Sequence, residues 1–153
     1  GLVNELIGLK KVVKEKVVKK LNKTNPKGLL YQGFRNGKLG WFKDKLKYHW
    51  TYVGEIKNDL PNGFGELKNY HGIYKGYWES GKYHGDGEFV FNNGRIYKGK
   101  WKNGFYDGYG RFSLNNGSYF IGDWKENREW NITKFDSNGE IIKKWVQGEK
   151  INN

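Results

Sequence analysis

The stretch GRIYKGKWKNGFYDGYGRFSLNNGSYFIGDW, residues 94–124, decides the fold because its second half repeats its first. Its landmarks return 23 residues later, with Gly94, Gly99 and Trp101 followed by Gly117, Gly122 and Trp124. The same interval leads back to Gly76 and Trp78. A fixed period of this length is typical of a repeat architecture, in which each copy is one small supersecondary unit.

Each copy of the repeat predicts one β-hairpin. In residues 97–102, Tyr97, Gly99 and Trp101 alternate with Lys98, Lys100 and Lys102, which is the pattern of a strand with one apolar face. Residues 103–108 carry the glycines and short polar side chains of a chain reversal, so we expect the turn there. A second strand then places Gly110, Phe112 and Leu114 on one face.

The glycines inside the predicted strands call for a packing explanation, because glycine normally weakens a strand. Gly76, Gly99 and Gly122 recur at the same place in every copy. We expect that they leave room for tyrosine and tryptophan rings of neighbouring strands to lie against bare backbone. A lone hairpin is marginal in water, so the copies must stack to share a core.

The pattern Tyr-x-Gly-x-Trp followed by Gly-x-Gly resembles the MORN repeat. Residues 74–87 and 97–110 match it closely, and residues 52–65 match it with Ile56 in the tryptophan position. A fourth copy opens at Phe120 but lacks the Gly-x-Gly pair, since residues 129–131 are Glu-Trp-Asn. The resemblance implies a mainly β fold of stacked antiparallel hairpins in a single-layer twisted sheet. The predicted repeat-core residues are Tyr52, Gly54, Tyr74, Gly76, Trp78, Tyr97, Gly99, Trp101, Gly122 and Trp124.

The rest of the chain divides around these copies. Residues 1–27 are predicted to be a basic amphipathic helix with its linker, and residues 28–51 a degenerate first repeat. The hairpin repeats occupy residues 52–130, and residues 131–153 form a degenerate terminal repeat that caps the stack. An unbroken alternation from Leu46 to Ile56 predicts one long strand at the entry to the regular copies.

The N-terminal segment allows two interpretations. Apolar side chains from Leu2 to Leu21 form a helical stripe, and Asn25-Pro26 ends the helix. Such a helix can lie on an anionic membrane surface. It can also cover the apolar face of the sheet or pair with another chain, because a single-layer sheet needs something against that face. Its candidate contacts with anionic lipid or an acidic partner are Lys10, Lys11, Lys14, Lys16, Lys19 and Lys20.

The charge of the chain favours acidic partners. Its formal net charge is +12, of which residues 1–27 supply +6. Lys98, Lys100 and Lys102 extend the candidate anionic contacts onto the repeats. Lysine and asparagine are abundant throughout, however, and an AT-rich genome would produce that composition without selection for binding.

The sequence nominates no reaction. It contains no cysteine, and its three histidines lack the spacing of metal ligands. The Gly-x-Gly pairs resemble a phosphate loop only superficially, because no helix and no Lys-Ser/Thr pair follows them. We therefore expect a protein that is not an enzyme, with no cofactor, no metal and no small-molecule substrate.

These observations leave two functions to compare. The first is a protein interaction scaffold that self-associates or docks a protein partner, which is the role the MORN resemblance implies. The second is a peripheral membrane protein that binds anionic phospholipid through the basic helix and the lysine-rich repeat face. Nucleic-acid binding is disfavoured, because the aromatic residues recur at positions that build the sheet. The expected location is the cytoplasm or the surface of a membrane.

Overall fold

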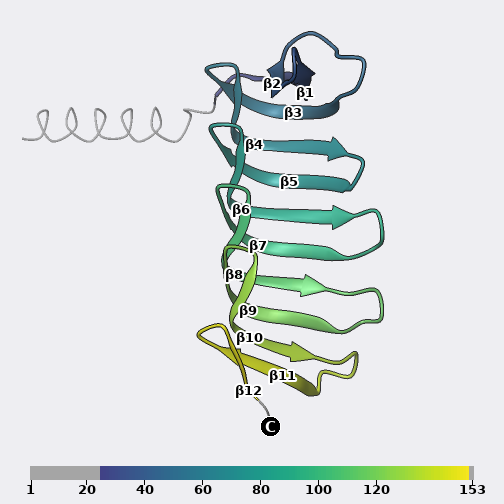
Figure 1. The fold of residues 1–153 in the computed structure, drawn as a ribbon, viewed down its shortest axis with the longest axis vertical. Helices are drawn as coiled ribbons and strands as arrows, with labels where there is room; N and C mark the ends of the chain where they lie inside the picture. Colours follow the sequence, from purple (N-terminus) through teal and green to yellow (C-terminus); the bar gives the residue numbers. More distant parts are fainter. Residues whose placement is uncertain (1–24, 152–153) are drawn as a thin grey trace, which may run out of the picture.

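The computed structural model describes residues 25–151, which form a ladder of antiparallel β-hairpins (Figure 1). Twelve strands make a single sheet within this range, in the order β12-β11-β10-β9-β8-β7-β6-β5-β4-β3-β1-β2. The strands are β1 (Lys27–Arg35), β2 (Lys38–Phe42), β3 (Trp50–Lys57), β4 (Leu60–Asn69), β5 (Gly72–Glu79), β6 (Lys82–Phe91), β7 (Ile96–Lys102), β8 (Phe105–Ser113), β9 (Tyr119–Lys125), β10 (Arg128–Phe135), β11 (Ile141–Val146) and β12 (Glu149–Ile151).

The predicted mainly β fold of stacked hairpins is confirmed. The predicted helix over Leu2–Leu21 lies outside the described residues, and residues 25–151 contain no helix. Consequently no helical segment capable of crossing a membrane occurs in the part of the chain that the structure describes.

Tight two-residue turns close the hairpins. Asn103 and Gly104 join β7 to β8 with φ angles of 51° and 87°, and positive φ at both central residues is typical of a type I′ turn. The sequence predicted a reversal spread over residues 103–108. That prediction was too long, because β8 already begins at Phe105. The right-handed twist of the strands favours this compact turn.

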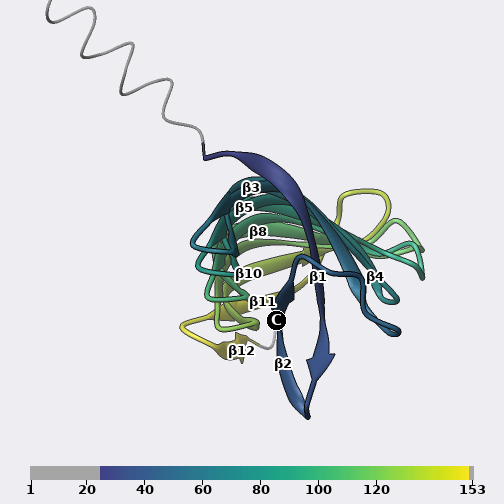
Figure 2. The same ribbon diagram turned by 90° about the horizontal axis from the view of Figure 1, so that it is seen from above.

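In the three regular hairpins the Gly-x-Gly pair lies inside the second strand, β4, β6 or β8, and the strand bends there. Between β5 and β6, Gly76 pairs with Gly87 and Trp78 pairs with Tyr83, so Tyr77 alone lies opposite residues 84–86. Gly85 in that segment has a φ of 72°, a conformation that glycine adopts without steric cost. Such a bulge increases bending and twist, and Figure 2 shows the resulting curved sheet.

The first hairpin is attached in reverse. β1 pairs with both β2 and β3, so β2 forms the outer edge of the sheet. The segment from Phe42 to Trp50 therefore crosses β1, and it does so over Gly33, where a Cβ would lie 2.7 Å from the carbonyl oxygen of Tyr48. The single long strand predicted from Leu46 is wrong, because β3 begins at Trp50. Residues 46–49 are instead part of the crossing segment.

The core lies on one face of the sheet, which we call the inner face and define by Tyr52, Tyr74 and Tyr97. These three tyrosines are fully buried, and Trp78, Trp101 and Trp124 are nearly so. Leu30, Leu67, Phe89 and Ile132 complete the buried apolar set. The bend in each hairpin brings rings from successive strands together, so that residues 25–151 bury this face against themselves.

Candidate interaction surfaces

The inner-face rings are packed in the same way in successive repeats. Tyr97 stacks on Tyr106 with ring centroids 3.7 Å apart and meets Trp101 edge-on at 5.1 Å. One repeat earlier, Tyr74 stacks on Tyr83 at 3.8 Å. Offset-stacked and edge-on arrangements are those that aromatic pairs favour. The tyrosines and tryptophans of the repeat therefore act as a core and do not form an exposed binding platform.

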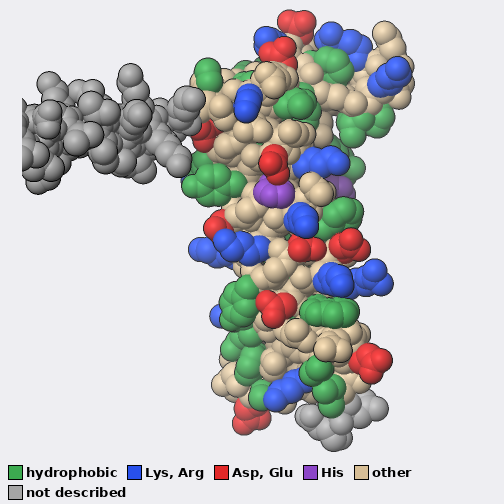
Figure 3. Space-filling view, turned by 90° about the vertical axis from the view of Figure 1, so that its left-hand side faces the viewer, with side chains coloured by type: hydrophobic (Ala, Val, Ile, Leu, Met, Phe, Trp, Pro, Cys, Tyr) green, Lys and Arg blue, Asp and Glu red, His purple; other side chains and the backbone are tan. Residues whose placement is uncertain are grey.

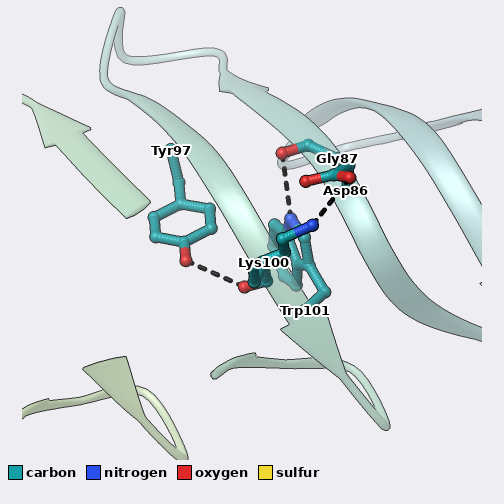
Figure 4. A network of polar contacts seen from close by, with 5 residues as sticks. All are labelled: Asp86, Gly87, Tyr97, Lys100 and Trp101. Carbon is teal, nitrogen blue, oxygen red and sulfur yellow. Dashed lines mark hydrogen bonds and ion pairs between the residues drawn. The ribbon is translucent and has the colours of Figure 1, made fainter. Parts of the chain in front are cut away.

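Polar atoms of the same rings bond to the backbone of the bulge, as Figure 4 shows for one repeat. The Tyr97 hydroxyl donates to the carbonyl oxygen of Lys100 at 2.9 Å, and Trp101 Nε1 donates to the carbonyl oxygen of Gly87 at 3.1 Å. Lys100 is the residue that lies opposite three residues of β8, so its carbonyl falls where the ladder is interrupted. The tyrosine thus satisfies an acceptor that the bulge would leave unpaired.

Burial changes the acidity of these tyrosines. Desolvation raises the pKa of Tyr52, Tyr74, Tyr83 and Tyr97 far above that of free tyrosine. Burial also raises the pKa of Tyr106, to about 12. All five side chains are consequently neutral at physiological pH and suited to an apolar core.

A row of glycines crosses the sheet beneath the rings. Register places Gly28, Gly54, Gly65, Gly76, Gly87, Gly99, Gly110 and Gly122 opposite one another on consecutive strands. A Cβ on Gly99 would lie 2.6 Å from the carbonyl oxygen of Tyr109, and one on Gly110 would lie 2.7 Å from the Tyr97 ring. Both positions therefore exclude a side chain, because backbone and an immobile ring occupy the space.

The predicted repeat core omitted Leu67 and Phe89, which are buried in the regular repeats. It also omitted Tyr83 and Tyr106, which are partly buried against that core. Each opens the second strand and stacks on a repeat tyrosine. Their shared 23-residue spacing was a signal, but it fell within the segment that we assigned to the turn. In the first regular repeat Pro61 takes the equivalent place opposite Ile56, and Trp41 of β2 packs edge-on against Tyr52 at 5.9 Å.

Glu55 is a further residue that the sequence did not single out. It is only 8% exposed, and its carboxylate accepts hydrogen bonds from the backbone N–H groups of Asn25 and Phe64. It occupies the bulge position that Tyr77 and Lys100 hold in later repeats. Glu55 thus fastens the start of the described chain to the first regular hairpin.

The face opposite the inner face, which we call the outer face and define by Lys98 and Lys100, carries charges of both signs. Lys100 Nζ lies 2.8 Å from Asp86 Oδ2, and Lys98 Nζ lies 3.7 Å from Glu88 Oε2. Directly opposite residues of neighbouring strands share a face, and Glu66, Lys75, Glu88 and Lys98 follow one another in this way. Figure 3 likewise shows basic and acidic side chains intermingled on the side that it draws.

The predicted lysine contacts therefore fall into separate groups. Two of the three repeat lysines have carboxylate neighbours, and Lys102 is exposed at the end of β7 without an ion pair to any described residue. Lys10, Lys11, Lys14, Lys16, Lys19 and Lys20 lie outside the described residues. Among the described residues, Lys98, Lys100 and Lys102 share the outer side of β7, and acidic side chains accompany the first two of them.

Large apolar side chains are exposed near both ends of the sheet. At the first hairpin, Phe34 is 69% exposed and Tyr48 is 79% exposed. At the last hairpin, Ile141, Ile142, Val146 and Ile151 are each more than 40% exposed. Exposed apolar groups that lie near one another commonly mark sites of interaction.

Beside the first hairpin lies an open hollow of about 850 Å³. Its walls come from the tip of β1–β2, the crossing segment at residues 47–49, the start of β3 and the end of β4 with the turn that follows. The two lysines that line it, Lys47 and Lys68, are its charged residues. The hollow is large enough to hold several side chains of a ligand.

No chemistry-bearing cluster was found among the described residues. Within residues 25–151, no group of three or more His, Asp or Glu side chains is arranged to hold a metal ion. His84 lies in β6 with Nε2 3.2 Å from Glu79 Oε2. A histidine and one carboxylate without a nucleophile do not form a catalytic arrangement.

Comparison with known families matches the regular part of the ladder. The model of the MORN repeat matches residues 52–69, 74–94 and 97–119. These segments coincide with the hairpins β3–β4, β5–β6 and β7–β8. No curated protein matches the chain.

Proposed function

We propose that this chain, which is a MORN-repeat protein, serves as a non-enzymatic scaffold that binds a protein partner or a second copy of itself. MORN repeats are generally associated with interactions with proteins and membranes. Because the inner-face aromatic side chains of the repeats form the core, we expect binding to involve the side chains that the core leaves exposed.

The observation that carries this proposal is the exposure of large apolar side chains near the two ends of the sheet. Phe34 and Tyr48 at one end, and Ile141, Ile142 and Val146 at the other, expose apolar side chains that are not part of the core. Folded chains rarely expose such groups in clusters unless another molecule covers them. A rigid ladder that separates two such groups is suited to holding partners at a fixed spacing.

Membrane binding is the second candidate, and the sequence of residues 1–27 favours it through its net charge of +6. About 1 kcal/mol per basic residue is available near an anionic surface. The outer face adds little to that attraction, because its lysines alternate with carboxylates. A membrane role would therefore depend on the N-terminal lysines.

Two measurements on the full chain test the proposal. The first is flotation with vesicles of zwitterionic lipid, with and without anionic lipid, at low and physiological salt. The second is cross-linking in a native lysate, with the solution mass measured by light scattering, for the chain and for a variant with Phe34→Ser, Tyr48→Ser, Ile142→Ser and Val146→Ser. We expect no flotation at physiological salt, and cross-links or self-association that the variant loses.

The outcome against the scaffold would be equally clear. Salt-sensitive flotation that requires anionic lipid, combined with identical cross-links and mass for chain and variant, would assign the chain to membrane binding. A variant with Lys14→Glu and Lys19→Glu, which keeps the exposed apolar groups, serves as the matched control for charge.

A further inference from the structure

The hollow beside the first hairpin is part of the folded structure and not a gap between loose segments. The crossing segment that walls it lies directly on the backbone of Gly33. His49 Nδ1 lies 2.6 Å from the carbonyl oxygen of Leu46, and the His49 ring meets Tyr31 edge-on at 4.8 Å. The contacts with Gly33 and Tyr31 hold the crossing segment against β1, so the wall of the hollow is packed on the sheet.

The lining of this hollow is apolar and exposed. Phe34, Leu39, Tyr48 and Tyr70 line it, and each is more than 50% exposed. Trp50, also in the lining, lies with its ring 5.5 Å from that of Tyr70. Aromatic side chains that have few rotatable bonds and stand in a concave site are typical anchors for a binding partner.

The charge of the hollow has one sign. Its charged lining residues are Lys47 and Lys68, and no carboxylate lines it. No ion pair joins either lysine to another residue within 25–151, in contrast to Lys98 and Lys100 on the outer face. A ligand that fills the hollow therefore gains from carrying negative charge.

We propose that this hollow binds an acidic peptide segment of a protein partner, with large apolar side chains of the peptide among Phe34, Leu39, Tyr48 and Tyr70 and its carboxylates at Lys47 and Lys68. The inference rests on the proposed scaffold function and names the class of partner. A concave site of this volume accepts several side chains. A flat bilayer would reach its rim but not its floor.

A second copy of the chain is a poorer occupant than an acidic partner. The apolar strand that another copy could offer, Ile141–Val146, carries Lys143 and Lys144. Those lysines would meet Lys47 and Lys68, and like charges brought together in an interface oppose binding. The net charge of +12 on each copy adds to this repulsion.

The test is selection of short random peptides displayed on phage against the full chain, followed by binding measurements on the selected peptides by fluorescence anisotropy. We expect enrichment of Asp and Glu together with Phe, Leu or Trp. Tyr48→Ser and Lys68→Glu should each weaken binding of the selected peptides by about tenfold or more. The matched controls, Val90→Ser and Arg95→Glu on a regular repeat, should leave binding unchanged.

Three results would overturn the inference. Selection of no peptides, or of peptides without acidic residues, would remove the proposed partner class. Peptides that bind both hollow variants as tightly as the parent chain would place binding elsewhere and leave the scaffold function standing. Binding of anionic vesicles that Lys47→Glu and Lys68→Glu abolish, in a chain that selects no acidic peptide, would assign the hollow to lipid.

Discussion

The regular hairpins and the first hairpin use similar residues for opposite purposes. In β7–β8, Tyr97 and Trp101 are buried and the hairpin contributes its aromatic rings to the core. In β1–β2, a turn of the same kind at Asn36 and Gly37 joins two strands, yet Phe34 beside it is 69% exposed. Both hairpins belong to the same sheet, so the difference lies in how each is attached.

The attachment explains the contrast. A regular hairpin has neighbours on both sides, and its rings contact rings of the strands before and after it. The first hairpin is reversed, with β2 at the edge and a crossing segment over Gly33. Its outward residues consequently have no next repeat to pack against. The inner-face aromatic residues of the regular repeats stabilise the fold, whereas Phe34 and Tyr48 at the irregular end lie outside the core and are exposed.

The largest expected effect is the difference in lost stability when one aromatic side chain is truncated in each of the two regions. Trp101 contacts the rings of Tyr74, Tyr83, Tyr97 and Tyr106, so Trp101→Ala should lower the free energy of unfolding by about 3–5 kcal/mol. Phe34→Ala should change it by less than about 0.5 kcal/mol. Chemical denaturation of both variants measures the difference. Equal losses of stability in the two variants would show that Phe34 packs in the core as Trp101 does, which would contradict the proposed contrast.

A slightly smaller effect is expected from filling the glycine row. Gly99→Val places a branched side chain against the carbonyl oxygen of Tyr109, so it should cost about 3 kcal/mol although valine favours strands. Lys98→Val, one residue away on the outer face, is the matched control and should be nearly neutral. If the two denaturation midpoints coincided, the packing explanation of the glycines would be wrong.

Alkaline pH should loosen the regular repeats through their tyrosines. Burial raises the pKa of Tyr106 from 10.0 to about 12, so the folded state holds this proton more tightly than the unfolded state. Its contribution is complete below about pH 10 and is lost as the pH rises from there towards 12. Thermal melting temperature measured between neutral pH and about pH 11 should fall, and Tyr106→Phe should reduce the fall. An unchanged slope in that variant would mean that Tyr106 has the same pKa in the folded and unfolded states.

Much of the fold could be predicted because the same type of hairpin recurs along the chain. The 23-residue period, the alternation in residues 97–102 and the recurring glycines were enough to predict stacked hairpins. The exact place of the turn could not be predicted, because Asn103, Gly104 and Gly108 are all residue types that are common in turns. Asn103 and Gly104 close the hairpin, whereas Gly108, with a φ of 99°, lies where β8 bends.

The candidate site could not be predicted, because it depends on strand order. Nothing in residues 28–51 shows that β1 would insert between β2 and β3 and bring residues 47–49 beside Tyr70. The curvature of the sheet could not be predicted from the sequence either. One of the two interpretations of residues 1–27 was a helix that covers the apolar face of the sheet, whereas residues 25–151 already bury Tyr52, Tyr74 and Tyr97 completely.

Residues 25–151 bury the aromatic inner face among themselves, so this core should not depend on residues 1–24. The most direct test is the free energy of unfolding of the full chain compared with that of a chain lacking residues 1–24, both measured by chemical denaturation followed through tryptophan fluorescence. We expect the same midpoint and the same dependence on denaturant for both chains, since the surface exposed on unfolding sets that dependence. A loss of several kcal/mol on deletion would contradict it, because the aromatic face would then need the N-terminal segment as its cover.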